Sequence, residues 1–348
     1  MREGRLVVDD VAEPRPQLGQ VLVRNLACGI CGSDLHFLRH AQTMVALTED
    51  MLPSMGPMGA FSGLHIDPSR DIIMGHEFCG EVLEVGPDTV GPKPGARVVS
   101  VPALISSRGV HQLAYNNEFP GGYAERMLLA APLVLEVPNG LDTRTAALTE
   151  PLAVGIHAVN KASVTPGEPV LVVGCGPVGL AVVAALRRAG VEVVIASDYS
   201  SARRKVALST GATEVVDPGE EPLVEAWKRL AGRRTPVVFE AVGVPGVIQQ
   251  LFRDVPPGTR IMVVGVCMES DVVNPFFAIS KELSVQFCLA YNNEEFRDAL
   301  RALAEGEIDA SSMVTGHVDL DGVPGAFEAL ARPEEHVKIL VEPAGSNQ

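Results

Sequence analysis

The sequence predicts an α/β protein of two domains, an antiparallel barrel-like domain and a doubly wound parallel sheet. The chain has 348 residues, about twice the usual length of one domain. Its first half contains short apolar runs separated by glycine and proline turns. From about Pro169 onward, apolar strands alternate with helical stretches, the pattern of a parallel sheet covered by helices.

Four short runs predict the strands of the first domain, and turn residues rather than helices separate most of them. These runs are residues 21–26, 81–85, 97–101 and 125–129. Strands of this kind favour an antiparallel, barrel-like arrangement.

The second domain is predicted from strands followed by helices. The predicted strands are 170–173, 192–196, 237–240, 260–264 and 284–290, and the predicted helices are 178–189, 202–209 and 247–252. Two later helices, 296–304 and 323–331, and a terminal strand, 337–341, are expected to return to the first domain. We therefore predict a catalytic domain of residues 1–154 and 291–348, and a dinucleotide-binding domain of residues 155–290.

Composition narrows the classes of function. Hydrophobic residues make up 47% of the chain and charged residues 20%, the balance of a folded globular protein. The net charge of −15, without a basic stripe, argues against nucleic acid as a partner. No run has signal-peptide character or the roughly 18 uninterrupted apolar residues of a membrane span, so we expect a cytoplasmic protein without a membrane partner.

A glycine-rich turn joins the first strand of the second domain to its helix. Gly174, Gly176 and Gly179 have the spacing that lets a chain turn tightly, approach a pyrophosphate and pack helix against strand. Pro177 suits the first position of that helix, where its missing N–H costs nothing. The segment predicts a dinucleotide site.

Asp198 ends the next strand about 20 residues later, where a ribose-binding carboxylate is expected. Such a carboxylate binds both ribose hydroxyls and repels a 2′-phosphate, which favours NAD over NADP. Arg203 argues for NADP instead, because its guanidinium could bind that 2′-phosphate. The same guanidinium could also lie along the adenine.

Four residues have the chemistry of zinc ligands: Cys31, His76, Glu77 and Glu150. Their wide spacing does not by itself show that they converge. Cys28 and Cys31 could instead form a redox pair or half of a zinc ribbon, although the second C-x2-C of a ribbon is absent. The six cysteines are too few and too scattered for a disulfide scaffold.

The segments CGICGSDLH, GHEFCGE and LTEPLAVGIHA, followed by GCGPVG and Asp198, resemble the zinc-containing medium-chain alcohol dehydrogenases, in their sorbitol, threonine and butanediol dehydrogenase branch. The resemblance extends over nearly the whole chain and implies a GroES-like barrel and a Rossmann domain. It implies that Cys31, His76 and Glu150 bind zinc, with Glu77 at the metal, and that Ser33 and His36 relay the proton. It also implies that further residues line the cofactor, namely Val178, Val242, Gly243, Val264, Gly265 and Val266.

Two features depart from that family. The interval 102–122 holds no cysteine, so we expect one catalytic zinc and no structural zinc. The stretch 37–74 is longer than usual, and Met44, Leu47 and Met51 are spaced along one face of a helix. That helix either packs on the barrel or forms an apolar lid over the substrate, which would favour a bulkier alcohol than a sugar polyol.

We therefore predict a zinc enzyme that transfers a hydride between a secondary alcohol and NAD. The alcohol could be a polyol, a diol, an amino alcohol or a bulkier cyclic alcohol, and a homodimer or homotetramer is implied by resemblance. Two alternatives stay open: a zinc-free quinone or enoyl reductase on the same scaffold, and a dinucleotide-sensing protein without turnover.

Overall fold

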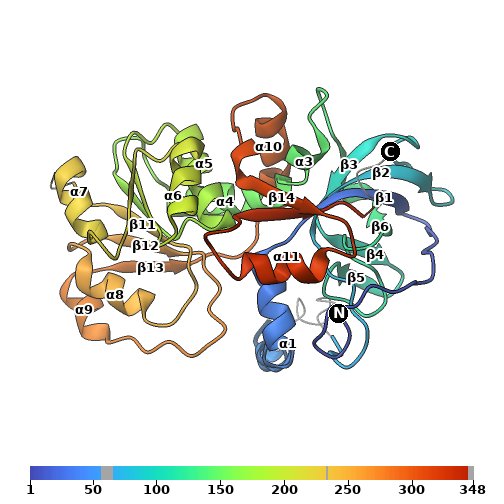
Figure 1. Ribbon diagram of the computed structural model, residues 1–348, viewed down its shortest axis with the longest axis horizontal. Coiled ribbons are helices and arrows are strands. Elements are labelled where there is room, and N and C mark those ends of the chain that lie inside the picture. Colours follow the sequence, from blue (N-terminus) through green and yellow to red (C-terminus); the bar gives the residue numbers. More distant parts are fainter. Residues whose placement is uncertain (56–65, 233, 344–348) are drawn as a thin grey trace. The chain divides into compact units, whose positions relative to one another are not determined.

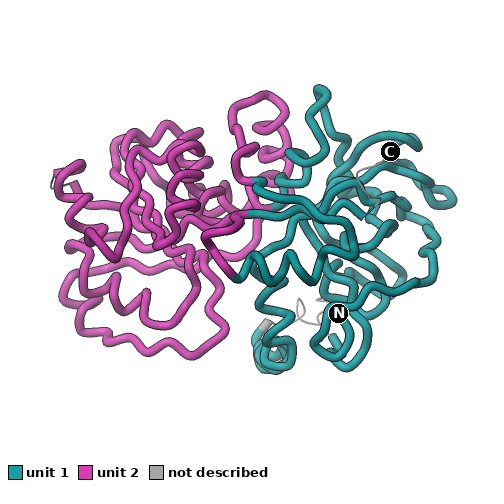
Figure 2. The backbone as a smooth tube through the Cα atoms, in the orientation of Figure 1, with its two compact units in different colours: residues 1–150, 314–331, 338–348 teal, residues 151–313, 332–337 magenta. Residues whose placement is uncertain are grey.

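The computed structural model describes residues 1–55, 66–232 and 234–343. The chain divides into two compact units (Figure 2). Unit 1 comprises residues 1–150, 314–331 and 338–348, and unit 2 comprises residues 151–313 and 332–337.

Unit 1 is built on a seven-stranded sheet in the order β14-β15-β1-β2-β3-β7, with β6 paired to β1. Strand β1 is central, because β2 pairs along one edge while β6 and β15 pair with the beginning and the end of the other edge. All neighbouring strands are antiparallel except β14 and β15. The bounds are β1 Gln20–Gly29, β2 Glu77–Val85, β3 Arg97–Ser100, β6 Arg126–Ala130, β7 Val134–Glu136, β14 Val314–Val318 and β15 Lys338–Val341.

Shorter elements complete unit 1. Strands β4 and β5 form a hairpin inside the interval that lacks cysteine, and 3-10 helices flank α1 and β6. The bounds are α1 Gly32–Met51, η1 Leu52–Met55, β4 Ala103–Ser106, β5 Gly109–Gln112, η2 Ala131–Leu133, α3 Thr143–Ala146 and α11 Val323–Leu330.

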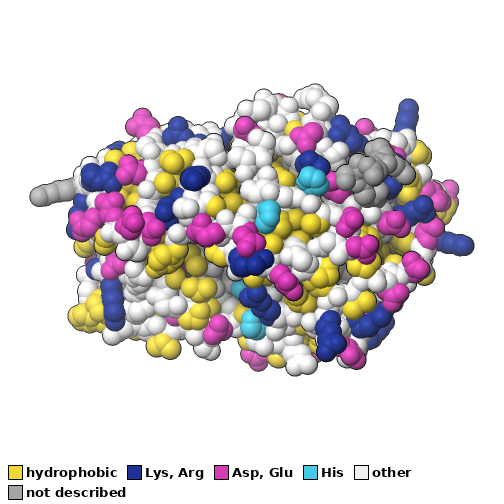
Figure 3. Space-filling view, in the orientation of Figure 1, with side chains coloured by type: hydrophobic (Ala, Val, Ile, Leu, Met, Phe, Trp, Pro, Cys, Tyr) yellow, Lys and Arg dark blue, Asp and Glu magenta, His cyan; other side chains and the backbone are white. Residues whose placement is uncertain are grey.

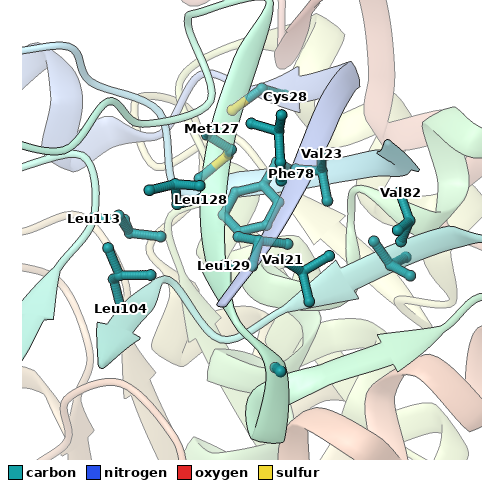
Figure 4. Close-up of a cluster of buried hydrophobic side chains, with 13 residues drawn as sticks. Val21, Val23, Cys28, Phe78, Val82, Leu104, Leu113, Met127, Leu128 and Leu129 are labelled. Atoms are coloured by element: carbon teal, nitrogen blue, oxygen red, sulfur yellow. The ribbon is translucent and has the colours of Figure 1, made fainter. Parts of the chain in front are cut away.

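One core of unit 1 lies between β1, β2, β6 and the β4–β5 region (Figure 4). Consecutive residues of β1 and β6 belong to this core, Val21 to Val23 and Met127 to Leu129, so neither strand shows a simple alternation of buried and exposed side chains here. Cys28 is fully buried among these side chains. Cys28 is therefore a packing residue. Cys31 differs from it, because Cys31 is only partly buried.

The long stretch 37–74 begins within α1, a helix of 20 residues that is kinked at His40. Met44 packs against a second core cluster, which Phe37, Ile72 and α11 help to form. Leu47 and Met51, at 52% and 46% exposure, do not share that packing. The predicted helix is present, but its apolar stripe is only partly covered by described residues. Residues 56–65 of the stretch 37–74 lie outside the described residues, so the proposed lid is described only in part.

Unit 2 is a six-stranded parallel sheet in the order β10-β9-β8-β11-β12-β13. Strands β11, β12 and β13 are labelled in Figure 1. Helices α5 and α6 pack together against β8 to β10, while side chains of α7 and α8 join a core cluster with the sheet residues Leu171, Ile195 and Val238. Helices therefore cover both faces, the predicted doubly wound arrangement.

The strands of unit 2 are β8 Val170–Val173, β9 Val194–Ser197, β10 Glu214–Val216, β11 Val237–Glu240, β12 Arg260–Val263 and β13 Ser284–Phe287. The helices are α4 Thr149–Ala162, which begins at the unit boundary, α5 Pro177–Arg188, α6 Ser201–Thr210, α7 Leu223–Ala231, α8 Val247–Asp254, α9 Pro275–Ser280, α10 Asn293–Ala304 and η3 Ser311–Met313. Our sequence prediction omitted β10, because a three-residue strand carries almost no periodic signal, and it also omitted the helices α4, α7 and α9.

The compact units differ from the predicted domains in three segments. Residues 151–154, 291–313 and 332–337, which we assigned to the first domain, belong to unit 2. The longest of these segments, 291–313, contains α10. The cause is visible in α10, where Glu295 accepts hydrogen bonds from His157 and Asn160 on α4 and Asp298 pairs with Arg188 on α5. The return to unit 1 begins at Val314 instead.

On the face of the molecule shown in Figure 3, acidic side chains are interspersed with basic ones, and the described side chains form no continuous basic stripe there. None of the helices in the described residues has the length and apolarity needed to cross a membrane.

Candidate active site

Three predicted ligands come together where β1 ends and α1 begins. Ligand atoms of Cys31, His76 and Glu77 all lie within 4.8 Å of one another. Cys31 is the N-cap of α1, and Glu77 starts β2, where it pairs with Gly29 across the sheet. A Cβ at position 29 would lie 2.0 Å from Glu77 Oε2, so only glycine fits beside that carboxylate. Glu150 is not part of this cluster among the described residues.

The cluster fits a zinc ion by its donors and its electrostatics. It offers sulfur, nitrogen and oxygen, the ligand types that zinc takes. Burial alone would lower the pKa of His76, but the negative charge of Asp34, with a smaller contribution from Cys31, raises it well above 6.5. A pocket that stabilises a positive charge in this way suits a cation.

Asp34 orients His76, a role that our sequence prediction missed. Its Oδ1 lies 3.6 Å from Nδ1 of His76, which leaves Nε2 to face a metal. Asp34 also accepts hydrogen bonds from the Cys31 N–H at 3.0 Å and the Tyr123 hydroxyl at 2.7 Å. Burial opposes its charge, yet the His76 charge and these bonds hold the pKa of Asp34 below 3.8. The available signal was a carboxylate at the third helical position after Cys31.

Lys338 is a second residue that we missed. Its ammonium lies 2.6 Å from Oε1 of Glu77 and also binds Oε2, and both side chains are fully buried. Burial would lower the pKa of Lys338, but the charges of Glu77, Cys31 and Glu150 raise it. Glu77 is therefore held by a lysine beside the proposed metal site. The negative charge of Glu150 also stabilises the charged form of that lysine.

The two predicted relay residues lie on α1. Ser33 Oγ is 2.9 Å from the hydroxyl of Tyr115, a residue outside our prediction. His36 is half-buried one turn further along, and burial, with smaller contributions from His40 and Arg39, lowers its pKa below 6.5.

The glycine-rich turn in unit 2 has the geometry of a dinucleotide site. Gly174 has φ +95°, and a Cβ at Gly179 would lie 1.9 Å from the carbonyl oxygen of Gly174. Gly176 is the N-cap of α5, with Pro177 at the first position. Apart from its chain neighbours, Arg203 is the only described residue within 4 Å of a Cβ built there. The open side of this turn and the start of the helix suit a pyrophosphate.

Asp198 closes the turn at the end of β9. Its carboxylate accepts hydrogen bonds from the Cys175 and Ser200 N–H groups, both at 2.8 Å, and lies 4.0 Å from the Arg203 guanidinium. The Arg203 Nε is buried and has no hydrogen-bond partner among described residues. The structure thus places the predicted carboxylate and the predicted arginine side by side.

The remaining predicted cofactor residues follow β11 and β12. Buried Glu240 accepts hydrogen bonds from the N–H groups of Val242 and Gly243, and a Cβ at Gly265 would lie 2.4 Å from the Gly243 nitrogen. These two loops therefore touch, and our prediction missed the glutamate that holds them. Val242 and Val266 remain partly exposed beside them.

Comparisons with known proteins agree with this fold. The alcohol dehydrogenase GroES-like domain family matches residues 17–139, and the zinc-binding dehydrogenase family matches residues 177–305. Such a pair of domains defines a dehydrogenase that uses zinc and a nicotinamide dinucleotide.

The (R,R)-butanediol dehydrogenase of Bacillus subtilis strain 168 is 31% identical and covers 97% of this chain and 96% of its own. Sorbitol dehydrogenase of the same organism is 28% identical over 93% of this chain and 90% of its own. A solved structure from Sinorhizobium meliloti 1021, described as a zinc-binding dehydrogenase bound to NADP, is also similar. Its TM-score is 0.80 and its sequence identity 30%, and the match covers 98% of this chain and 97% of the other. The chain belongs to the zinc-type medium-chain alcohol dehydrogenase family.

Proposed function

We propose that this protein transfers a hydride between a secondary alcohol and NAD, with one zinc per chain held by Cys31 and His76. The observation that carries the proposal is the cluster of Cys31, His76 and Glu77 with Asp34 behind His76. A zinc-free quinone or enoyl reductase would have no use for that cluster.

The chain's own residues would position the reactants and handle the proton. When bound, zinc supplies Lewis-acid polarisation of an alcohol oxygen, and the nicotinamide ring supplies the hydride acceptor. Cys31 and His76 would hold the metal, with Glu77 or Glu150 as the third protein ligand. Ser33 would accept the hydrogen bond of the alcohol, and His36 would exchange the proton with solvent because its lowered pKa keeps it neutral near pH 7.

NAD is the coenzyme that Asp198 supports. A carboxylate at the end of β9 would accept hydrogen bonds from the ribose hydroxyls and repel a 2′-phosphate. Two observations favour NADP instead: the presence of Arg203 beside Asp198, and the NADP bound in the Sinorhizobium structure. Because Asp198 stands 4.0 Å from Arg203 and partly neutralises it, we assign the preference to NAD.

The substrate that we propose is a diol or polyol, the class named for the butanediol and sorbitol dehydrogenases to which the chain is similar. Exposed Leu47 and Met51 on α1 add apolar surface to the insertion. They support a preference for an alcohol that is more apolar than a sugar.

A homo-oligomer is also proposed. Strand β13 ends the order of the parallel sheet, and around it Phe276, Ile279, Phe287 and Leu289 are each at least 67% exposed. An apolar edge strand of this kind is suited to pairing with a second copy of the chain.

One experiment tests the function. Purified protein is analysed for zinc and screened for reduction of NAD and of NADP with diols, polyols, amino alcohols and cyclic secondary alcohols. We expect about one zinc per chain and a higher kcat/KM with NAD than with NADP. Protein that binds zinc but reduces neither coenzyme with any alcohol would refute the proposal.

A further inference from the structure

Tyr115 lies against the Ser33 hydroxyl, although the two residues are 82 positions apart in the chain. The Tyr115 hydroxyl is 2.9 Å from Ser33 Oγ and 3.1 Å from Oδ1 of Asp34. Tyr115 is only 8% exposed. One phenol group therefore joins the proposed relay residue to the carboxylate that orients His76.

Packing fixes the position of this phenol. The Tyr115 ring lies 4.9 Å from the ring of Phe37 and 5.7 Å from that of His76, measured between centroids. The preceding residue, Ala114, is fully buried and has φ +76°, a conformation that alanine keeps only where the surrounding structure imposes it. The Tyr115 hydroxyl thus has little freedom to move away from Ser33.

The direction of the hydrogen bonds follows from the groups present. A phenol has one proton, and an ionised carboxylate can only accept. The Tyr115 proton lies between the Asp34 carboxylate and Ser33 Oγ, which is the nearer of the two acceptors. With the phenol donating to Ser33, a second lone pair of Ser33 Oγ stays free to accept a hydrogen bond from an alcohol, and the Ser33 proton stays free to be passed on.

We propose that Tyr115 is a positioning residue for proton transfer at Ser33, holding its hydroxyl in the rotamer that receives the hydrogen bond of the alcohol. This inference rests on the proposed function, in which Ser33 is the residue that receives that bond.

A purely structural role for Tyr115 would act through Asp34 rather than through Ser33. Asp34 does not depend on Tyr115 alone, because it also accepts hydrogen bonds from Tyr123 and from the Cys31 N–H. Removal of the Tyr115 hydroxyl therefore leaves Asp34 with partners, whereas no other side-chain partner of Ser33 is found among the described residues.

A double-mutant cycle on the zinc-loaded full-length chain tests the inference. Its members are the wild type, Tyr115→Phe, Ser33→Ala and the double variant, each measured for zinc content, thermal midpoint, kcat and the KM values of alcohol and coenzyme. We expect Tyr115→Phe to lower kcat about 10-fold, with zinc content and coenzyme KM unchanged. In the Ser33→Ala background the same substitution should change kcat less than about twofold.

Other outcomes are equally decisive. Equal effects of Tyr115→Phe in both backgrounds, or loss of zinc from this variant, would show a structural role and overturn the inference while leaving the proposed function intact. Unchanged kcat in Tyr115→Phe would also overturn the inference and leave the proposed function intact. A zinc-loaded wild type without turnover on any alcohol would overturn both.

Discussion

The Lys338 ammonium and the Glu77 carboxylate, 261 positions apart in the chain, form a fully buried ion pair with an Nζ to Oε1 distance of 2.6 Å. Strand pairing brings them together, because Gly29 lies opposite Glu77 on one edge of β1 and opposite Leu340 on the other. The pair lies beside the proposed zinc ligands.

Lys338→Met should destabilise the metal-free protein by about 3–5 kcal/mol, because it leaves the Glu77 charge buried without a partner. The double variant Lys338→Met/Glu77→Gln removes both charges and should recover most of that loss. Urea midpoints of EDTA-treated protein measure both effects. If the double variant is as unstable as the single one, the buried charge is not the cause.

Cys31→Ala and Cys28→Ala form a matched pair of variants that tests which cysteine binds the metal. Cys31 belongs to the proposed ligand cluster, whereas Cys28 is buried in the core. Cys31→Ala should lose zinc and activity together. Cys28→Ala should keep zinc and lose roughly 1 kcal/mol of stability through a small cavity. The zinc content of each variant, measured by mass spectrometry, tests this expectation. Retention of zinc by Cys31→Ala would remove this residue from the ligand set.

The pH profile of alcohol oxidation should report His36. The imidazole must be neutral to take up a proton, so activity falls as pH drops through its pKa, which burial and the charges of His40 and Arg39 place below 6.5. His40→Gln removes one of those charges, so the pKa of His36 should rise and the acid limb should move to higher pH. His36→Gln is the control. An unchanged acid limb in this control would assign it to another group.

The edge of the parallel sheet provides a test of assembly. Phe287 on β13 is 67% exposed, and Phe287→Glu would place a charge on the apolar surface proposed to bind a second copy. Sedimentation velocity should show a smaller species than the wild type. Val90→Glu, at a 97% exposed position in unit 1, should sediment like the wild type. A Phe287→Glu variant with the wild-type mass would place the interface elsewhere.

The sequence by itself determined the features that depend on neighbouring residues. The turn at Gly174, Gly176 and Gly179 requires glycine for local reasons, and Asp198 follows at the distance set by one helix and one strand. Apolar runs likewise predicted most strands, because side-chain alternation is a local property. Even Cys31 and His76 were recognisable, since each lies in a short characteristic segment.

Only the tertiary structure decided which distant residues complete the site. No periodicity marks Lys338 as the partner of Glu77, and nothing near Tyr115 in the sequence indicates Ser33. Asp34 became identifiable as the partner of His76 only when β2 was paired beside the start of α1. Local sequence encodes backbone conformation, whereas contacts across 82 or 261 residues depend on how strands pair and cores pack, which short patterns do not contain.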